Sequence, residues 1–418
     1  MPGTHPHPAP VAAPAREPFP AHVAVFNVPM HGHVNPTLGV VEELVRRGHR
    51  VSYAVTEDFV HQVKAAGAEP VLYPDPGDGS EAPEDMGEGF ERVVDVALAS
   101  LPVLARAYGT DRPDLVLCDI YAFAGLLLAA RWQVPAVVAS PTHLAYDGIV
   151  PEFFGVPGLP QLPGFGRLAA AFAEQGVDST RIHDLVRPEH AVAFFPRSFQ
   201  RRADTVAAQR VAYAGPALGD RSYQGSWRPP RPDVPVLLVS LGSQFTRRPE
   251  FYRSCVQAFA ELPWHVVMSV GPAVPVDGLG PLPANVEVHP HVPQLAVLAH
   301  ADAFVTHAGM GGTMEALHFG VPLVAVPQMA EQRVNADRIE RLRLGVHLPR
   351  ESVTPEALRE AVLRVSSDRD IRAGVAAMRR EIAAAGGAGA AADLIERALW
   401  SVFPVAPAPV PMFRGVTS

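Results

Sequence analysis

The chain has 418 residues, of which 48% are hydrophobic and 19% charged, and its formal net charge is −8. This length exceeds one ordinary hydrophobic core, so two domains are expected. The acidic balance argues against nucleic acid as the main partner. Two separate cysteines, Cys118 and Cys255, exclude a disulfide scaffold or a zinc ribbon. Residues 1–21 lack the apolar core of a signal peptide and no apolar run is long enough to span a membrane, so we expect a cytoplasmic protein.

The first half of the chain alternates between buried-strand patterns and helical patterns. A strand at 23–28 precedes the segment His31-Gly32-His33-Val34-Asn35-Pro36, and a helix then continues to Gly48. Asn35 suits the cap of this helix and Pro36 its first position, which predicts a boundary between them. Further strands are expected at 50–55, 70–73, 114–118, 135–139, 191–195 and 211–214, with helices at 57–66, at 90–108 and up to residue 132.

The second half repeats the alternation after a segment rich in Gly, Pro and Arg. We interpret residues 216–233 as a linker between one domain at 22–215 and another at 234–403, with tails at 1–21 and 404–418. The fold class is therefore α/β, with two Rossmann-like, doubly wound domains facing across a cleft. Irregular loops at 75–89 and 141–165 are expected to border that cleft, because ligands bind beyond the carboxyl ends of parallel strands.

A glycine-rich turn in the second half is a candidate phosphate site. The apolar run at 304–306 ends in His307-Ala308-Gly309-Met310-Gly311-Gly312-Thr313-Met314-Glu315, where a helical pattern begins. A strand, a glycine turn and a helix start leave backbone N–H groups free to hold phosphate. The turn matches neither G-x-G-x-x-G nor G-x-x-x-x-G-K-[ST], so it does not indicate a dehydrogenase or a P-loop ATPase.

The first half offers a candidate general base, His33. It lies beside a predicted helix N-terminus, whose positive end disfavours the imidazolium form, so a nearby carboxylate is needed to stabilise a captured proton. Asp119, at the end of another strand, is suited to this role. A packing or capping role for His33 remains the simpler reading. His31 and His33 could also bind a metal, although no acidic or Cys partner stands at ligand spacing.

Four further segments of the second half carry polar side chains at predicted turns or helix starts. Ser240-Leu241-Gly242-Ser243 is a strand-end turn that could touch phosphate, and 285–295 places an imidazole and an amide after a strand. Glu331-Gln332, at a helix start, suits polyol hydroxyls, although helix capping explains it equally well. Asp368-Arg369-Asp370 is interpreted as solvated surface.

Together, in this order and spacing, these motifs resemble the family 1 glycosyltransferases of the GT-B fold. The likeness is greatest to the actinobacterial macrolide glycosyltransferases, and it runs from about residue 21 to residue 403. It implies an acceptor-binding first domain, bordered by the two loops above, and a donor-binding second domain. It also implies that His33 is the catalytic base and Asp119 its partner. The donor-binding residues that it implies are Ser243, His291, Val292, Gln294, His307, Gly309, Met310, Gly311, Gly312, Thr313, Glu315, Glu331 and Gln332.

Within that set the resemblance implies separate roles. His307, Ser243 and the backbone around Gly311 would contact the diphosphate, Glu315 the ribose, and Glu331 and Gln332 the sugar hydroxyls, while Gln294 would read the uracil edge. The family usually has Trp stacked on uracil where this chain has His291. A smaller ring stacks less well, which leaves the choice between uridine and thymidine open.

The implied activity is an inverting, UDP-dependent transfer of a hexose, glucose from UDP-glucose, to a hydroxyl of a macrolide or a similar apolar natural product. Such a reaction would inactivate or tailor an antibiotic, with no cofactor and no metal, in a monomer or homodimer that binds neither nucleic acid nor membrane. The alternatives are a dTDP-deoxysugar transferase, a sugar-nucleotide epimerase, or a non-catalytic helper of a partner transferase.

Overall fold

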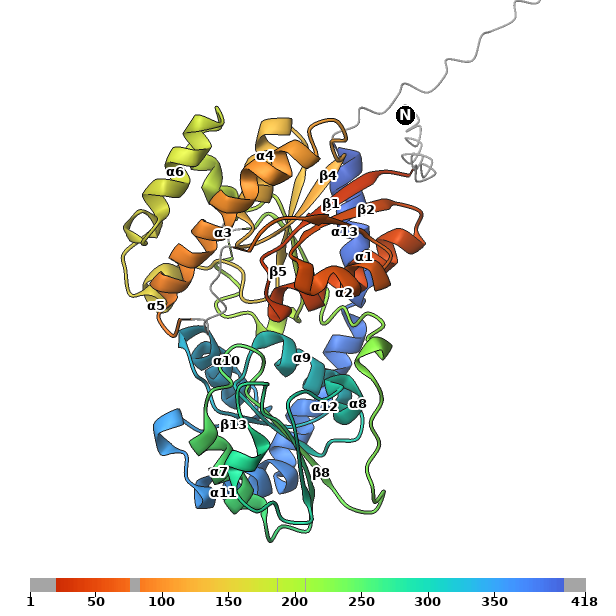
Figure 1. The fold of residues 1–418 in the computed structure, drawn as a ribbon, viewed down its shortest axis with the longest axis vertical. Helices are drawn as coiled ribbons and strands as arrows, with labels where there is room; N and C mark the ends of the chain where they lie inside the picture. Colours follow the sequence, from red (N-terminus) through yellow and green to blue (C-terminus); the bar gives the residue numbers. More distant parts are fainter. Residues whose placement is uncertain (1–19, 76–82, 186, 207, 402–418) are drawn as a thin grey trace, which may run out of the picture.

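The structure is a computed structural model that describes residues 20–75, 83–185, 187–206 and 208–401. The predicted tail at 404–418, all but the end of the tail at 1–21, and residues 76–82 of the first predicted loop lie outside the described residues. The chain forms two α/β halves stacked end to end, as Figure 1 shows. Each half is built around a parallel sheet, which confirms the predicted fold class.

The first sheet has seven parallel strands among the described residues, in the order β3-β2-β1-β4-β5-β6-β7. Its central strands are buried along their whole length, since helices cover both faces, and their residues are apolar apart from His22 and Asp119 at the strand ends. The strands are β1 (His22–Phe26), β2 (Arg50–Val55), β3 (Glu69–Leu72), β4 (Leu115–Asp119), β5 (Ala136–Ser140), β6 (His190–Ala193) and β7 (Arg210–Tyr213).

The helices of this half lie in two layers. On one face, apolar side chains of the first and second helices pack on β1 and β2, and on the other face the third, fourth and sixth helices form a separate core. The helices are α1 (His31–Arg46), α2 (Val60–Ala65), α3 (Met86–Ala107), α4 (Phe123–Trp132), α5 (Ile149–Phe154) and α6 (Phe165–Glu174). Short 3₁₀ turns occupy Glu57–Phe59, Leu159–Gln161, Ser179–Leu185, Arg197–Phe199 and Ser222–Gln224.

The predicted start of α1 is wrong. The helix begins at His31 instead of Pro36, and Asn35 and Pro36 lie inside it. Its first turn forms because the Met30 carbonyl accepts hydrogen bonds from the N–H groups of His33 and Val34, both at 2.9 Å. The Asn27 amide also donates to the His33 carbonyl at 3.0 Å, a tertiary contact that capping signals cannot reveal. His33 is therefore part of the first helical turn.

The segment 141–165, predicted to be irregular, contains one short helix. Gly148 and Gly155, both in the left-handed region, bracket α5, and Gly164 in the same conformation precedes α6. Glycine adopts this conformation at no steric cost, so each marks a sharp helix end. The sequence prediction missed α6 altogether.

The second sheet has six parallel strands among the described residues, in the order β10-β9-β8-β11-β12-β13. The strands are β8 (Val236–Ser240), β9 (His265–Ser269), β10 (Val286–His289), β11 (Ala303–Thr306), β12 (Leu323–Ala325) and β13 (Gly345–His347). The short strand β13 was not predicted. The helices are α7 (Pro249–Phe259), α8 (Gln294–Leu298), α9 (Met310–Phe319), α10 (Ala330–Arg341), α11 (Pro355–Ser367), α12 (Arg369–Ala384) and α13 (Gly387–Ser401), with 3₁₀ turns at Val276–Leu279 and Arg350–Ser352.

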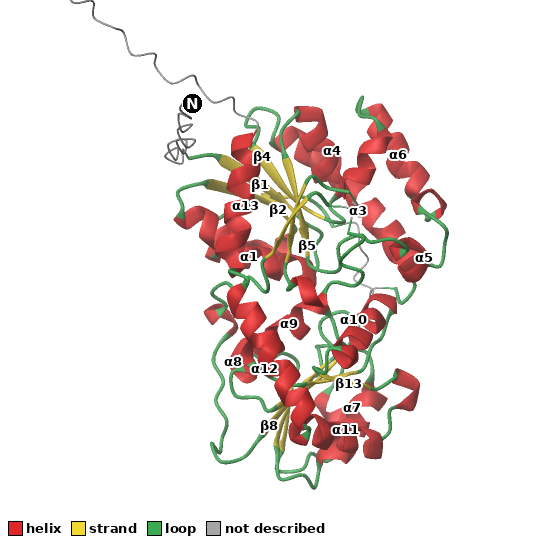
Figure 2. Cartoon of the chain, turned by 180° about the vertical axis from the view of Figure 1, so that it is seen from behind, coloured by secondary structure: helices red, strands yellow, loops and turns green. Residues whose placement is uncertain are grey.

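The final helix crosses back to the first half. We predicted α13 within the second domain, but its buried residues, such as Ile395 and Leu399, join the core formed by α1 and the first sheet. Figures 1 and 2 both show α13 beside α1. An ion-pair cluster holds it there, because Arg47, which directly follows α1, pairs with Asp393 and Glu396 at 2.7 Å each. The two halves are therefore tied together by the linker and by the α12–α13 connection.

Candidate active site

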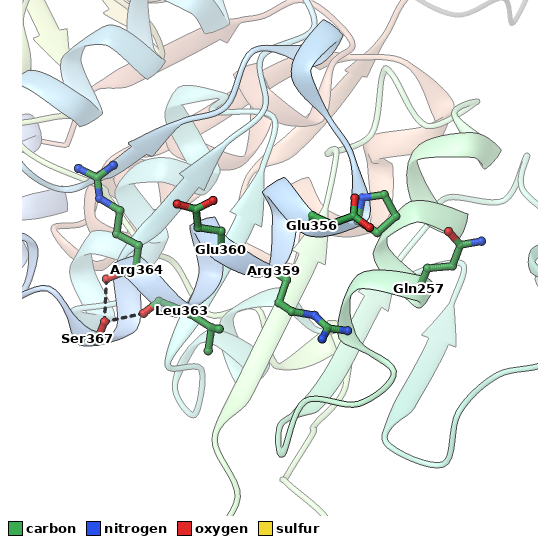
Figure 3. A pocket seen from close by; sticks show the side chains of 8 residues that line it. Gln257, Glu356, Arg359, Glu360, Leu363, Arg364 and Ser367 are labelled. Atoms are coloured by element: carbon green, nitrogen blue, oxygen red, sulfur yellow. Dashed lines mark hydrogen bonds between the residues drawn. The ribbon is translucent and has the colours of Figure 1, made fainter.

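One cavity of about 790 Å³ lies between the two halves, beyond the carboxyl ends of β1, β5, β8 and β11. Of the predicted site residues, it is lined by His33, Ser243, His291, Val292, Gln294, His307, Gly309, Met310, Gly311, Gly312, Glu315, Glu331 and Gln332. Asp119 and Thr313 are buried and do not line it. A second hollow of about 740 Å³, beside α7 and α11, contains none of these residues (Figure 3).

His33 and Asp119 form a direct hydrogen-bonded pair. Nδ1 of His33 lies 2.8 Å from Oδ2 of Asp119, whose side chain is fully buried, whereas the His33 side chain is 15% exposed and faces the cavity. The other carboxylate oxygen accepts the backbone N–H of Tyr121 at 2.9 Å. An ionised Asp119 thus makes Nδ1 the protonated nitrogen, and Nε2 of His33 keeps the lone pair of a general base.

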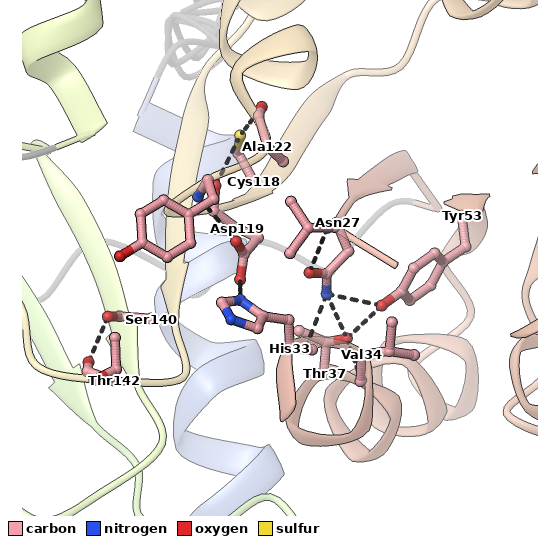
Figure 4. Close-up of polar contacts among 12 residues, drawn as sticks. Asn27, His33, Val34, Thr37, Tyr53, Cys118, Asp119, Ala122, Ser140 and Thr142 are labelled. Atoms are coloured by element: carbon pink, nitrogen blue, oxygen red, sulfur yellow. Dashed lines mark hydrogen bonds and ion pairs between the residues drawn. The ribbon is translucent and has the colours of Figure 1, made fainter. Parts of the chain in front are cut away.

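A buried polar network supports the helix turn that carries His33 (Figure 4). The Asn27 amide donates to the His33 carbonyl and to the Tyr53 hydroxyl, both at 3.0 Å, and Thr37 and Tyr53 share a 2.7 Å hydrogen bond. Because Tyr53 lies on β2, Thr37 on α1 and Asn27 directly after β1, the network fixes the turn to the sheet. Sequence reasoning did not find this network, since its members are far apart in the chain.

The predicted phosphate turn joins β11 to α9. Ala308 adopts a left-handed conformation, with φ of 62°, and the Asn335 side chain donates to its carbonyl at 2.9 Å. This strained turn aims the start of α9 at the cavity. The N–H groups from Met310 to Gly312 precede the first intrahelical hydrogen bond, which Thr313 donates to the Gly309 carbonyl at 3.0 Å. They are available to an anion at the positive end of the helix.

His307 is the first residue of this turn, and its ring lies close to two glycines. A Cβ atom on Gly242 would lie 2.6 Å from the His307 ring, and one on Gly309 would also collide with it. Burial lowers the pKa of His307 to about 4, although the backbone of Ser240 opposes the shift. The ring is therefore neutral at pH 7, and it can donate one N–H to a phosphate oxygen.

Glu315 makes hydrogen bonds with two side chains. One of its oxygens accepts from the Gln294 side chain at 2.6 Å, and the other pairs with Arg221 at 2.6 Å. Gln294 was predicted to read the edge of a base, but here it donates to Glu315, the residue predicted to bind the ribose. Arg221 lies in the predicted linker and also lines the cavity. Sequence reasoning did not find Arg221, because the segment contains several arginines and nothing in the sequence distinguishes one of them from the others.

Glu331 is held by residues from both halves. Its Oε1 accepts from the Thr142 hydroxyl at 2.8 Å, across the cleft, and from the Asn335 side chain at 2.7 Å. Burial raises the pKa of Glu331, partly offset by these two donors. Asn335 thus links the predicted sugar-binding carboxylate to the strained turn at Ala308. Gln332 faces the same cavity while its Oε1 accepts the backbone N–H of Gln328 at 2.8 Å.

His291 and Ser243 are exposed residues of the cavity wall. His31, from the acceptor-side helix α1, lies within electrostatic reach of His291 and Arg221, and these two groups, after burial, lower its pKa. The described residues contain no group of three or more His, Cys, Asp or Glu side chains arranged to hold a metal ion. No helix in the described ranges is long and apolar enough to cross a membrane.

Comparison with known proteins relates this geometry to sugar transfer. The C-terminal domain model of erythromycin biosynthesis protein CIII-like proteins matches residues 254–396. Oleandomycin glycosyltransferase of Streptomyces antibioticus is 41% identical over 392 residues, covering 91% of each chain. The chain belongs to the natural-product glycosyltransferases of the GT-B fold. This confirms the resemblance inferred from the motifs.

Two further relatives of the glycosyltransferase cover nearly its whole length. Demethyllactenocin mycarosyltransferase of Streptomyces fradiae is 39% identical over 399 residues, covering 90% of this chain and 86% of the relative. The crystal structure of the glycotransferase of kitacinnamycin superimposes with a TM-score of 0.81 at 40% identity, covering 91% of this chain and 99% of that one. The architecture of both halves is thus shared with a solved glycosyltransferase.

Proposed function

We propose that the protein transfers a hexose, glucose from UDP-glucose, to a hydroxyl group of a macrolide or a similar apolar natural product, with inversion at the anomeric carbon. The observation that carries this proposal is the position of the His33–Asp119 pair in the same cavity as the N-terminus of α9. A base on one side of a cleft and an anion site on the other suit attack on a sugar whose leaving group is a diphosphate.

The proposed step needs only groups of this chain and the two substrates. As the acceptor oxygen bonds to the anomeric carbon, its proton passes to Nε2 of His33. The bond between that carbon and the diphosphate oxygen breaks, and its electron pair leaves with the diphosphate. Asp119, 2.8 Å from Nδ1, stabilises the imidazolium that forms. In-line attack converts an α-linked donor into a β-linked product.

The leaving diphosphate would be stabilised by His307 and by the free N–H groups of α9. We propose that these groups make a metal ion unnecessary. Glu331 would accept hydrogen bonds from the hydroxyls of the transferred sugar and Gln332 would donate hydrogen bonds to them, since both residues line the cavity. The acceptor side of the cavity is largely apolar, as suits a macrolide, with Met86, Phe90, Val93, Val96 and Phe154 in its wall.

A second candidate function is transfer of a deoxysugar from a dTDP donor. His291 leaves it open, because the family's usual stacking surface for uracil is absent at that position. One relative at 39% identity is named a mycarosyltransferase, which is also consistent with a deoxysugar donor. An epimerase or a non-catalytic helper has no use for the His33–Asp119 pair.

The test is a screen of nucleotide-sugar donors against macrolide and phenolic acceptors, followed by mass spectrometry with EDTA present. The expected result is a mass gain of one hexose on a macrolide with UDP-glucose, and its loss in His33→Ala, whose nucleotide affinity stays near wild type. A gain of one deoxyhexose with a dTDP donor alone would establish the second candidate. No transfer from any donor would overturn both, and activity of His33→Ala would overturn the assignment of the base.

A further inference from the structure

Arg221 places a buried guanidinium in the cavity from the linker between the two halves. Its side chain and that of Glu315 are each only 7% exposed, and Nη1 donates to Oε1 of Glu315 at 2.6 Å. Glu315 lies on α9, in the second half, so this ion pair spans the cleft. A buried guanidinium needs partners for its other donors, because desolvated N–H groups are costly to leave unpaired.

One donor of Arg221 has no such partner. Its Nε is buried and makes no hydrogen bond to any of the described residues. Its side chain lines the cavity beside the Glu315 carboxylate that Nη1 contacts. A buried donor left unpaired costs about 1–3 kcal/mol, and native structures retain such groups mainly where a ligand or water completes them.

The backbone of Arg221 is fixed to the first half. Glu42 of α1 accepts the N–H of Asp220 through both carboxylate oxygens, at 3.1 Å each. The linker lies so close to this helix that a Cβ on Gly39 would meet the Ala217 carbonyl oxygen at 2.5 Å. Arg221 is therefore positioned by the helix that carries His33, while its side chain contacts the helix that carries Glu315.

The remaining hydrogen-bonding capacity of Glu315 suits a pair of ribose hydroxyls. An ionised carboxylate accepts about four hydrogen bonds, and Arg221 and Gln294 occupy one on each oxygen. Two sites remain, one for each vicinal hydroxyl. The adjacent guanidinium fixes the orientation of the Glu315 carboxylate.

We infer that Arg221 is a positioning residue that holds Glu315 in place for the ribose hydroxyls of the nucleotide. The inference rests on the proposed nucleotide-sugar donor. It assigns to the linker a role in distinguishing ribose from 2′-deoxyribose. Loss of Arg221 then weakens binding of a ribonucleotide more than binding of its 2′-deoxy counterpart, since only the former has both hydroxyls to present to Glu315.

The test is isothermal titration of UDP and 2′-deoxy-UDP into the wild type, Arg221→Gln, Glu315→Gln and the double variant. Arg231→Gln is the matched control, because Arg231 is an exposed linker arginine that pairs with exposed Asp233. We expect UDP affinity to fall about 10- to 100-fold in Arg221→Gln, the loss of one charge-assisted hydrogen bond. The ratio of the two affinities should fall towards one, and the double variant should bind no more weakly than Glu315→Gln.

Three results would overturn the inference while leaving the proposed function intact. They are unchanged UDP affinity in Arg221→Gln, an equal loss for both nucleotides accompanied by a lower melting temperature, and additive losses in the double variant. If the wild type binds neither UDP nor 2′-deoxy-UDP, the proposed UDP-dependent function itself fails.

Discussion

Replacing Asp119 by Asn should nearly abolish transfer while leaving the fold intact. Asn has the size of Asp, and its carbonyl oxygen can still accept the backbone N–H of Tyr121, which lies 2.9 Å from Oδ1. The amide nitrogen must then face Nδ1 of His33, where Oδ2 lies 2.8 Å away in the native chain. An N–H donor at that place demands a lone pair on Nδ1. The proton moves to Nε2, and the base can no longer accept the proton of the acceptor hydroxyl.

The magnitude follows from the lost charge pair. At an effective dielectric constant of about 20 and a charge separation of about 4 Å, a carboxylate stabilises an imidazolium by about 4 kcal/mol. That corresponds to roughly a 10³-fold decrease in kcat, and the wrong tautomer lowers it further. The KM for the sugar donor should change little, because Asp119 lies behind His33 and does not line the cavity.

The assay is steady-state transfer measured by product mass, with UDP affinity and thermal unfolding measured in parallel. Asp370→Asn is the matched control, since Asp370 makes an exposed ion pair with Arg343. A kcat for Asp119→Asn within about tenfold of wild type would refute the role of Asp119, because it would show that the buried charge stabilises no proton on His33.

Three other predictions concern the donor half. Gly242→Ala should weaken UDP binding at least about tenfold, because the new Cβ would lie 2.6 Å from the His307 ring. Gly280→Ala is the control: its backbone is equally strained, at φ of 86°, but a Cβ there meets open space, so UDP affinity should not change. Equal UDP affinities of the two variants would contradict this prediction. Glu331→Gln should raise the KM for the sugar donor about tenfold and leave UDP affinity unchanged. The control Glu340→Gln, on the same helix, should leave the KM unchanged. An unchanged KM in Glu331→Gln would exclude a contact between Glu331 and the sugar. Burial lowers the pKa of His307 to about 4 in the folded chain, so the unfolded chain takes up this proton at a higher pH than the folded chain does. The free energy of unfolding that is present above pH 6.5 should therefore fall by on the order of 3 kcal/mol as the pH decreases towards 4. Chemical denaturation at several pH values should give a shallower decline for His307→Asn, and an identical decline would refute the assignment.

The sequence was sufficient where the signal is local. Strand periodicity and glycine turns predicted two parallel sheets. The motifs that contain His33, His307 and Glu331 were predicted to face one cleft, and all three residues line one cavity between the halves. These motifs lie at strand ends, where chain order determines the edge of the sheet at which they meet.

The rest depended on contacts between distant segments. The start of α1 depends on Asn27, and the position of α13 depends on apolar residues of the first sheet, so neither follows from helix signals. Arg221 and Thr142 contact the donor residues across the cleft, at sequence separations of 94 and 189. A single sequence cannot reveal such pairs, because no periodicity or turn chemistry links them.

The central claim is direct attack on the anomeric carbon with His33 as base. The measurement that tests it most directly is the anomeric configuration of the product formed from an α-linked nucleotide sugar, read from the proton coupling constant of the new linkage by NMR. Inversion predicts a β-linked product from the wild type. An α-linked product would contradict a single in-line displacement and require a different mechanism.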